Sequence, residues 1–290
     1  MARHLGWCLM LIGLMSAGAS AQWFDFYPNA TGDHASWTDA NNWVRYNNDD
    51  LNLYPPYPSQ SYYSGVYPNK TGPITQVAYV RDQASATIAA GTSINMGSVR
   101  VGDPYYYDNG HPLLARTGST LTVGGTLTCE QYLVAGGVYP GLIVQKAGAR
   151  VTVPEFRVGF AEDYMSTAAS STYRMEGGYL AGARSELGHM GGVGVFEQTG
   201  GTAKFNWLNL GYSDSGGAGT GIYNLYGGTA SPYMFALGST TYMATGYLNL
   251  LGGVVRFDAT DPTPGGSFTI SRGGVKLGED FYCEDRKSVV

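Results

Sequence analysis

One short unit recurs four times in the second half of the chain, as YRMEGG (173–178), VFEQTGG (195–201), IYNLYGG (222–228) and YLNLLGG (247–253). Each copy ends in a pair of glycines. In several copies a second glycine, which follows Val or Leu, lies 11 residues after the first one. This spacing is found for Gly91 and Gly102, Gly148 and Gly159, Gly177 and Gly188, Gly200 and Gly211, and Gly227 and Gly238. Landmarks that repeat at a fixed distance are the signature of a solenoid.

Alternation within each unit predicts β-strands with one packed face and one wet face. Three positions before the first glycine the residue is polar, and one position earlier it is apolar. The polar set is Gln145, Arg174, Glu197, Asn224 and Asn249. The second strand alternates in the same way before its closing glycine, with Arg100, Arg157, Glu186 and Asn209 at the polar position and Ala236 as the exception. Ser185 breaks this pattern, because the other copies carry an apolar residue at its position.

Two strands and a glycine turn per unit predict an all-β fold, a parallel β-helix or β-solenoid of about six or seven coils with three short sides. We expect a right-handed coil, because parallel β connections nearly always take that hand. Almost no helix is expected. Stacking would place Arg174 beside Glu197 and Asn224 beside Asn249. The composition agrees, since Gly accounts for 43 of 290 residues without a collagen period.

The N-terminus predicts export. Arg3 and His4 precede an apolar run, residues 5–15, and Ala19-Ser20-Ala21 offers a small-residue cleavage site. Residues 1–21 therefore read as a signal peptide cleaved after Ala21, because the apolar run is too short to span a bilayer. The mature protein is expected to be secreted or held at the cell surface.

Three further segments follow. Residues 22–73 are aromatic and Pro-rich, and we expect an irregular cap on the first coil, although aromatic clusters also bind sugars. Residues 74–284 form the predicted solenoid. Residues 285–290 resemble the translation of a sequencing adapter, which predicts that the native C-terminus is missing.

The charge and the remaining residue types exclude several classes of partner. The net charge is −5 and there is no basic stripe, so we expect no nucleic-acid partner. No histidine pair has metal-ligand spacing, and we expect neither a metal nor a cofactor. Cleavage of the signal peptide would leave Cys129 and Cys283, whose pairing stays open.

Together the export signal, the W-x5-W segment (Trp37 to Trp43), the motif L-x-V-G-G-x-L (121–127) and the Q-x-G-G and L-x-L-G motifs resemble secreted bacterial β-helix proteins. These are the autotransporter-associated-repeat and PEP-CTERM-type exported proteins of planctomycete-like bacteria. The resemblance covers roughly residues 37–253. Such proteins typically end in a membrane anchor, so it implies that membrane contact would come only through a C-terminal anchor that this sequence lacks.

The leading functional hypothesis is a secreted or surface-displayed structural or adhesion protein without catalytic activity. A polysaccharide lyase or hydrolase is a less favoured alternative, since β-helices also house such enzymes. Glycoside hydrolysis needs two neighbouring carboxylates. Glu186 with Asp214, or with Glu162 and Asp163, could supply them, but solvated loop carboxylates are the simpler interpretation.

A third hypothesis is an extracellular carbohydrate-binding module. Tyr105, Tyr106 and Tyr107 cannot all face inward on a strand, because neighbours alternate. Trp207 has the opposite parity to the apolar residues that follow it, and it is expected to face outward. Flat aromatic surfaces stack on sugar rings, so the possible partners are extracellular polysaccharides or matrix components.

Overall fold

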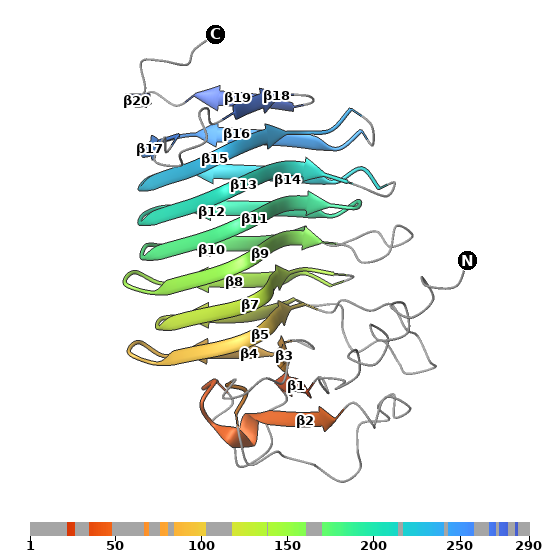
Figure 1. The fold of residues 1–290 in the computed structure, drawn as a ribbon, viewed down its shortest axis with the longest axis vertical. Helices are drawn as coiled ribbons and strands as arrows, with labels where there is room; N and C mark the ends of the chain where they lie inside the picture. Colours follow the sequence, from red (N-terminus) through yellow and green to blue (C-terminus); the bar gives the residue numbers. More distant parts are fainter. Residues whose placement is uncertain are drawn as a thin grey trace, which may run out of the picture.

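A computed structural model describes residues 22–26, 35–47, 67–69, 76–80, 84–102, 118–137, 139–160, 170–213, 217–240, 243–257, 267–270, 273–277 and 282–283. Its strands stack into a rod, and from Gln76 onward the chain colours follow one another along it (Figure 1). Within these ranges the single helical element is a 3-10 turn, η1 (Ala40–Asn42). The prediction of an all-β parallel solenoid with almost no helix is confirmed.

Two sheets build the rod. The first has eight short strands: β4 (Ser85–Ile88), β6 (Ser119–Val123), β8 (Gly141–Gln145), β10 (Ser170–Met175), β12 (Val193–Gln198), β14 (Thr220–Leu225), β16 (Thr245–Leu250) and β19 (Gly273–Leu277). The second contains longer strands: β3 (Gln76–Val80), β5 (Ser93–Val101), β7 (Thr126–Ala135), β9 (Arg150–Phe160), β11 (Tyr179–His189), β13 (Thr202–Tyr212) and β15 (Thr229–Leu237). Its ends carry β1 (Gln22–Phe26), β2 (Trp43–Asn47), β17 (Val254–Val255), β18 (Ser267–Ile270) and β20 (Tyr282–Cys283).

Each coil consists of one short strand followed by one long strand. Strands pair with their equivalents in the coils before and after, and these pairings are parallel. About five coils, from β6–β7 to β14–β15, have paired strands on both sides, which is slightly fewer than the six or seven coils expected. Repetition of one cross-section therefore accounts for most of the described chain.

The long strands bend in the middle, which gives each coil its third side. In β9 the residues Pro154 and Glu155 both face outward, so the alternation changes phase there. The register between β9 and β11 pairs Val153 with Gly182 and then Glu155 with Arg184, passing over one residue in each strand. The second half of every long strand consequently forms a separate outer face, and this face carries the candidate site.

Glycine turns allow successive coils to approach closely. Gly178, the second glycine of its pair, has a φ of 79°, and a Cβ built on it would lie 2.1 Å from the Ala149 carbonyl oxygen. The closing glycine Gly188 has a φ of 70° and would place a Cβ 2.0 Å from the Thr220 carbonyl oxygen. Any side chain at these positions would meet the backbone of another coil. The two recurring glycines thus have steric roles as well as conformational ones.

The outward ladders form as expected in four coils. Arg174 Nε lies 3.0 Å from Glu197 Oε2, and Asn249 Nδ2 donates to Asn224 Oδ1 at 2.7 Å. The prediction for Gln145 was wrong, since this side chain is fully buried and aligns with Met175. The turn after β8 contains one more residue than the turn after β10, so counting back from Gly148 shifts the parity by one.

Buried glutamines recur near the glycine turns. The Gln145 amide donates to the Ala149 and Tyr179 carbonyls at 3.1 Å, and its oxygen accepts from the Tyr173 hydroxyl at 2.5 Å. Gln198 accepts a hydrogen bond from the Tyr223 hydroxyl in the same way. Each pair satisfies the polar groups of a tyrosine and of turn carbonyls inside an apolar core.

Ser185 is inward-facing, and its small size has a packing reason. Gly182 and Ser185 lie on β11 between Phe156 of β9 and Phe205 of β13. The two phenylalanine rings stack with centroids 6.3 Å apart, and Phe205 and Phe156 are the apolar atoms nearest to a Cβ added at Gly182. Aromatic rings from the coils on either side therefore fill the space that a larger residue would occupy.

Aromatic residues near the N-terminus pack into the same core. Trp37 and Trp43 are fully buried, with ring centroids 4.6 Å apart in an edge-on arrangement. Strand β1 pairs in parallel with β3 and antiparallel with β2, which extends the long-strand sheet past the first coil. Cys129 is a free thiol buried in the core.

Candidate functional site

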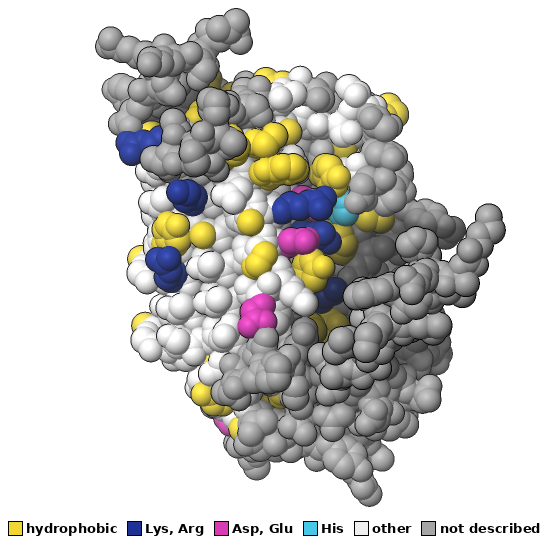
Figure 2. Space-filling view, viewed as in Figure 1, with side chains coloured by type: hydrophobic (Ala, Val, Ile, Leu, Met, Phe, Trp, Pro, Cys, Tyr) yellow, Lys and Arg dark blue, Asp and Glu magenta, His cyan; other side chains and the backbone are white. Residues whose placement is uncertain are grey.

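The outer face beyond the bend displays two columns of side chains in register. The first column consists of Tyr132, Glu155, Arg184, Trp207 and Met234, on strands β7 to β15. The second consists of Val134, Arg157, Glu186, Asn209 and Ala236. Arginine, glutamate and histidine gather here beside hydrophobic side chains (Figure 2). We call this surface the mixed face.

An ion-pair network occupies its centre. Arg184 Nε lies 2.7 Å from Glu186 Oε1, and Arg157 Nε lies 3.3 Å from Glu186 Oε2. Arg157 Nη2 also contacts Glu155 Oε2 at 2.7 Å. The Glu186 side chain is fully buried although its position faces outward, and this burial raises the pKa of its carboxyl group, an effect that the two guanidinium groups partly offset.

A stack of rings borders the network. The His189 ring lies between those of Phe160 and Tyr212, with centroids 5.0 and 5.3 Å away and planes within 8° and 14° of parallel. Arg157 Cζ is 4.8 Å from the Phe160 centroid, and Arg184 Cζ is 5.4 Å from that of Tyr212. Cation–π contacts of this kind join the ion pairs to the rings and hold the guanidinium groups in place.

Sequence reasoning gave His189 no role and missed this ring stack. A signal for it exists: the residue after the closing glycine is a ring in three successive copies, in the dipeptides ending at Phe160, His189 and Tyr212. The register pairs His189 with both of the others. Counting forward from the closing glycine, as well as back from it, would have found the stack.

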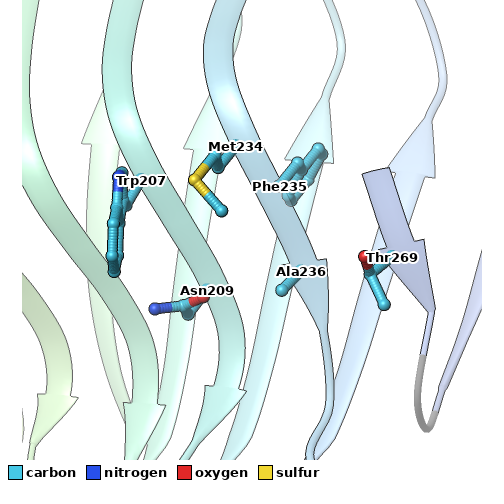
Figure 3. A pocket seen from close by; sticks show the side chains of 6 residues that line it. All are labelled: Trp207, Asn209, Met234, Phe235, Ala236 and Thr269. Carbon is cyan, nitrogen blue, oxygen red and sulfur yellow. The ribbon is translucent and has the colours of Figure 1, made fainter. Parts of the chain in front are cut away.

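Trp207 faces solvent, as expected, with 52% of its surface exposed. It lines a shallow groove of about 70 Å³ together with Asn209, Met234, Phe235, Ala236 and Thr269. The indole stands beside Met234, while Asn209, Ala236 and Thr269 follow one another across β13, β15 and β18 (Figure 3). An exposed aromatic face thus lies next to an amide and a hydroxyl group.

The other candidate residues from the sequence fall in parts of the chain that the structure does not describe. Tyr105, Tyr106 and Tyr107 lie outside the described residues, as do the carboxylates Glu162, Asp163 and Asp214 that were considered as partners of Glu186. Within the described chain, both carboxylate oxygens of Glu186 are in contact with guanidinium groups.

The described ranges contain no group of three or more His, Cys, Asp or Glu side chains arranged to hold a metal ion. Nor does any helix in those ranges combine the length and apolar character that crossing a bilayer demands. Comparison of the chain with protein-family models, with curated proteins and with solved structures gave no match in any of the three.

Proposed function

We propose that this chain is a secreted or cell-surface β-solenoid with a structural or adhesive role in the extracellular matrix and without catalytic activity. The observation that carries the proposal is the uninterrupted stack of coils, in which the same positions of successive coils lie in register on both sheets. Such a rod presents long outer faces while its own backbone hydrogen bonds are satisfied between coils.

The side chains support a scaffold role. Inward positions hold a continuous apolar core that runs from Phe24 to Val255, and burying each large side chain contributes about 1.5–3 kcal/mol. On the outside, ladders such as Lys146 with Glu176 and Arg174 with Glu197 join one coil to the next. Most regular positions of the repeat are thereby used for packing, turns and ladders.

Export is the other half of the proposal, and its motivation is the predicted signal peptide, residues 1–21. The test is fractionation of the producing cells with an antibody against the solenoid. The proposal expects the protein in the medium or on the cell surface, shortened at its N-terminus to start at Gln22. A protein found only in the cytoplasm would contradict it.

The structural role needs a separate measurement. Deletion of the gene should weaken cell attachment or matrix cohesion, and the wild-type gene should restore it. Deletion strains with unchanged attachment and matrix would argue against the role. An enzymatic role would be favoured instead by turnover of a polysaccharide that disappears in Glu186→Gln without loss of folding.

A further inference from the structure

Trp207 differs from the other tryptophan side chains that the structure describes. Trp37 and Trp43 are fully buried, whereas Trp207 exposes about half of its surface in the middle of β13. An isolated exposed apolar residue is common on protein surfaces and by itself indicates nothing. Here the indole also forms one wall of a groove whose other residues include an amide and a hydroxyl group, Asn209 and Thr269.

The groove matches the surface chemistry of a sugar. A pyranose ring has an apolar C–H face, which packs on an aromatic ring, and a rim of hydroxyl groups, which need hydrogen-bond partners. Trp207 and Met234 supply apolar surface, and Asn209 and Thr269 supply donors and acceptors. Ala236 lies between Asn209 and Thr269, and its small side chain leaves the groove open there. Trp is well suited to such a site because its broad ring combines apolar area with a polar N–H.

The size of the groove favours a polymer. Its volume of about 70 Å³ is well below the roughly 300–1,000 Å³ of sites that bury a small molecule. A ligand held here lies on the surface, so a single sugar would make few contacts. A glycan chain laid across β13, β15 and β18 would add contacts at each strand, about 4.8 Å apart.

Charge on the mixed face favours an uncharged glycan. The two arginines next to the groove, Arg157 and Arg184, are matched by Glu155 and Glu186, to which they are ion-paired. The cluster has no formal excess of positive charge to attract uronates or sulfated sugars. One of these arginines, Arg184, is the register partner of Trp207 on β11, so the ion pairs lie directly beside the indole.

We propose that the mixed face binds a neutral polysaccharide, with one sugar ring stacked on Trp207 and its hydroxyl groups hydrogen-bonded by Asn209 and Thr269. This goes beyond the structural role proposed above and does not depend on it. Binding of the purified protein can fail while an attachment defect of the deletion strain remains, so the two proposals fail separately.

Affinity gel electrophoresis of the purified full chain tests the proposal. The probes are hydroxyethyl cellulose, xylan, galactomannan and laminarin as neutral polysaccharides, with polygalacturonate and alginate as acidic ones. We expect retardation by at least one neutral probe. Trp207→Ala should weaken it about tenfold or more, as truncation of an aromatic anchor does at other binding surfaces. Asn209→Ala should weaken it by a smaller factor.

Tyr247→Ala is the matched control, because Tyr247 is 44% exposed but lies on the short-strand sheet. It should bind as the wild type does, and circular dichroism should show all variants folded. The proposal is overturned if no neutral probe retards the protein, if Trp207→Ala binds as well as wild type, or if Tyr247→Ala loses binding equally. Retardation by the acidic probes alone, abolished by salt, would also overturn it.

Discussion

Gln198 allows a strict test of how the core is built. In register with it on the neighbouring strands are Met175 and Leu225, so leucine is already accepted at this position of the repeat. The Gln198 amide donates to the carbonyls of Gly200, Gly201 and Thr229 at 3.1–3.3 Å, and its oxygen accepts from the Tyr223 hydroxyl. Gln198→Leu keeps the volume similar and removes all of these bonds.

Most of the stability lost in Gln198→Leu should come from one hydroxyl group, that of Tyr223, which is left without a hydrogen-bond partner. Tyr223 is 1% exposed, so its hydroxyl would lose its partner without gaining water. Leaving such a group unsatisfied costs about 1–3 kcal/mol. The equivalent residue one coil earlier is Phe196, which predicts that Tyr223→Phe removes the unsatisfied hydroxyl without disturbing the packing. The double variant Gln198→Leu/Tyr223→Phe should therefore recover most of the lost stability.

Thermal and urea unfolding followed by circular dichroism would measure this. We expect Gln198→Leu to lower the Tm by about 2–4 °C for each kcal/mol lost, and the double variant to lie closer to wild type. Arg174→Ala serves as the control, since its exposed ion pair with Glu197 should contribute about 0–1 kcal/mol. A double variant as unstable as Gln198→Leu alone would refute the idea that the orphaned hydroxyl sets the cost.

Three further predictions concern packing, turns and pH. Ser185→Leu should destabilise by about 1–3 kcal/mol, because the rings around it, including Phe205, already fill the space; unchanged urea unfolding would contradict this. Gly188→Ala should lower the free energy of unfolding more than Gly91→Ala does. Both glycines have a positive φ, but only Gly188 has backbone atoms within 4 Å of an added Cβ. Equal Tm values for the two variants would count against the steric clash. Burial raises the pKa of Glu186 above its ordinary 4.5 in the fold. The stability of the wild type relative to Glu186→Gln should therefore be greatest below pH 4.5 and should fall as the pH rises through the folded pKa. Paired denaturation curves would contradict this if the stability difference grew with pH.

The repeat made the fold predictable. Glycine spacing and parity were enough to place Arg174 beside Glu197 and Asn224 beside Asn249, because every coil uses the same positions for turns and for the core. The error at Gln145 arose where a turn gained one residue, and in a structure of period two a single residue reverses every side chain before it.

The candidate site was only partly predictable. Alternation showed that Trp207 and Glu186 face outward, yet parity carries no information on what covers an outward residue. Trp207 is exposed, as its parity indicated, whereas Glu186 is completely buried and both of its carboxylate oxygens contact guanidinium groups, those of Arg157 and Arg184. The bend in the long strands was missed as well. It depends on two successive outward residues, Pro154 and Glu155 in β9, which no apolar pattern announces.

The close backbone contacts at the closing glycines have a consequence for how this chain tolerates insertions. A Cβ at Gly194, near the start of β12, would lie 2.0 Å from the Val158 carbonyl oxygen, near the end of β9. The start of this short strand therefore packs directly against the backbone of an earlier coil. Segments of different length between a closing glycine and the next short strand are followed by the same alignment. Nine residues lie between Phe160 and Ser170, while seven lie between Tyr212 and Thr220, and the strands that follow keep the same register. The segments on this edge of the rod can thus change length one at a time without shifting the strand register of the coils that follow.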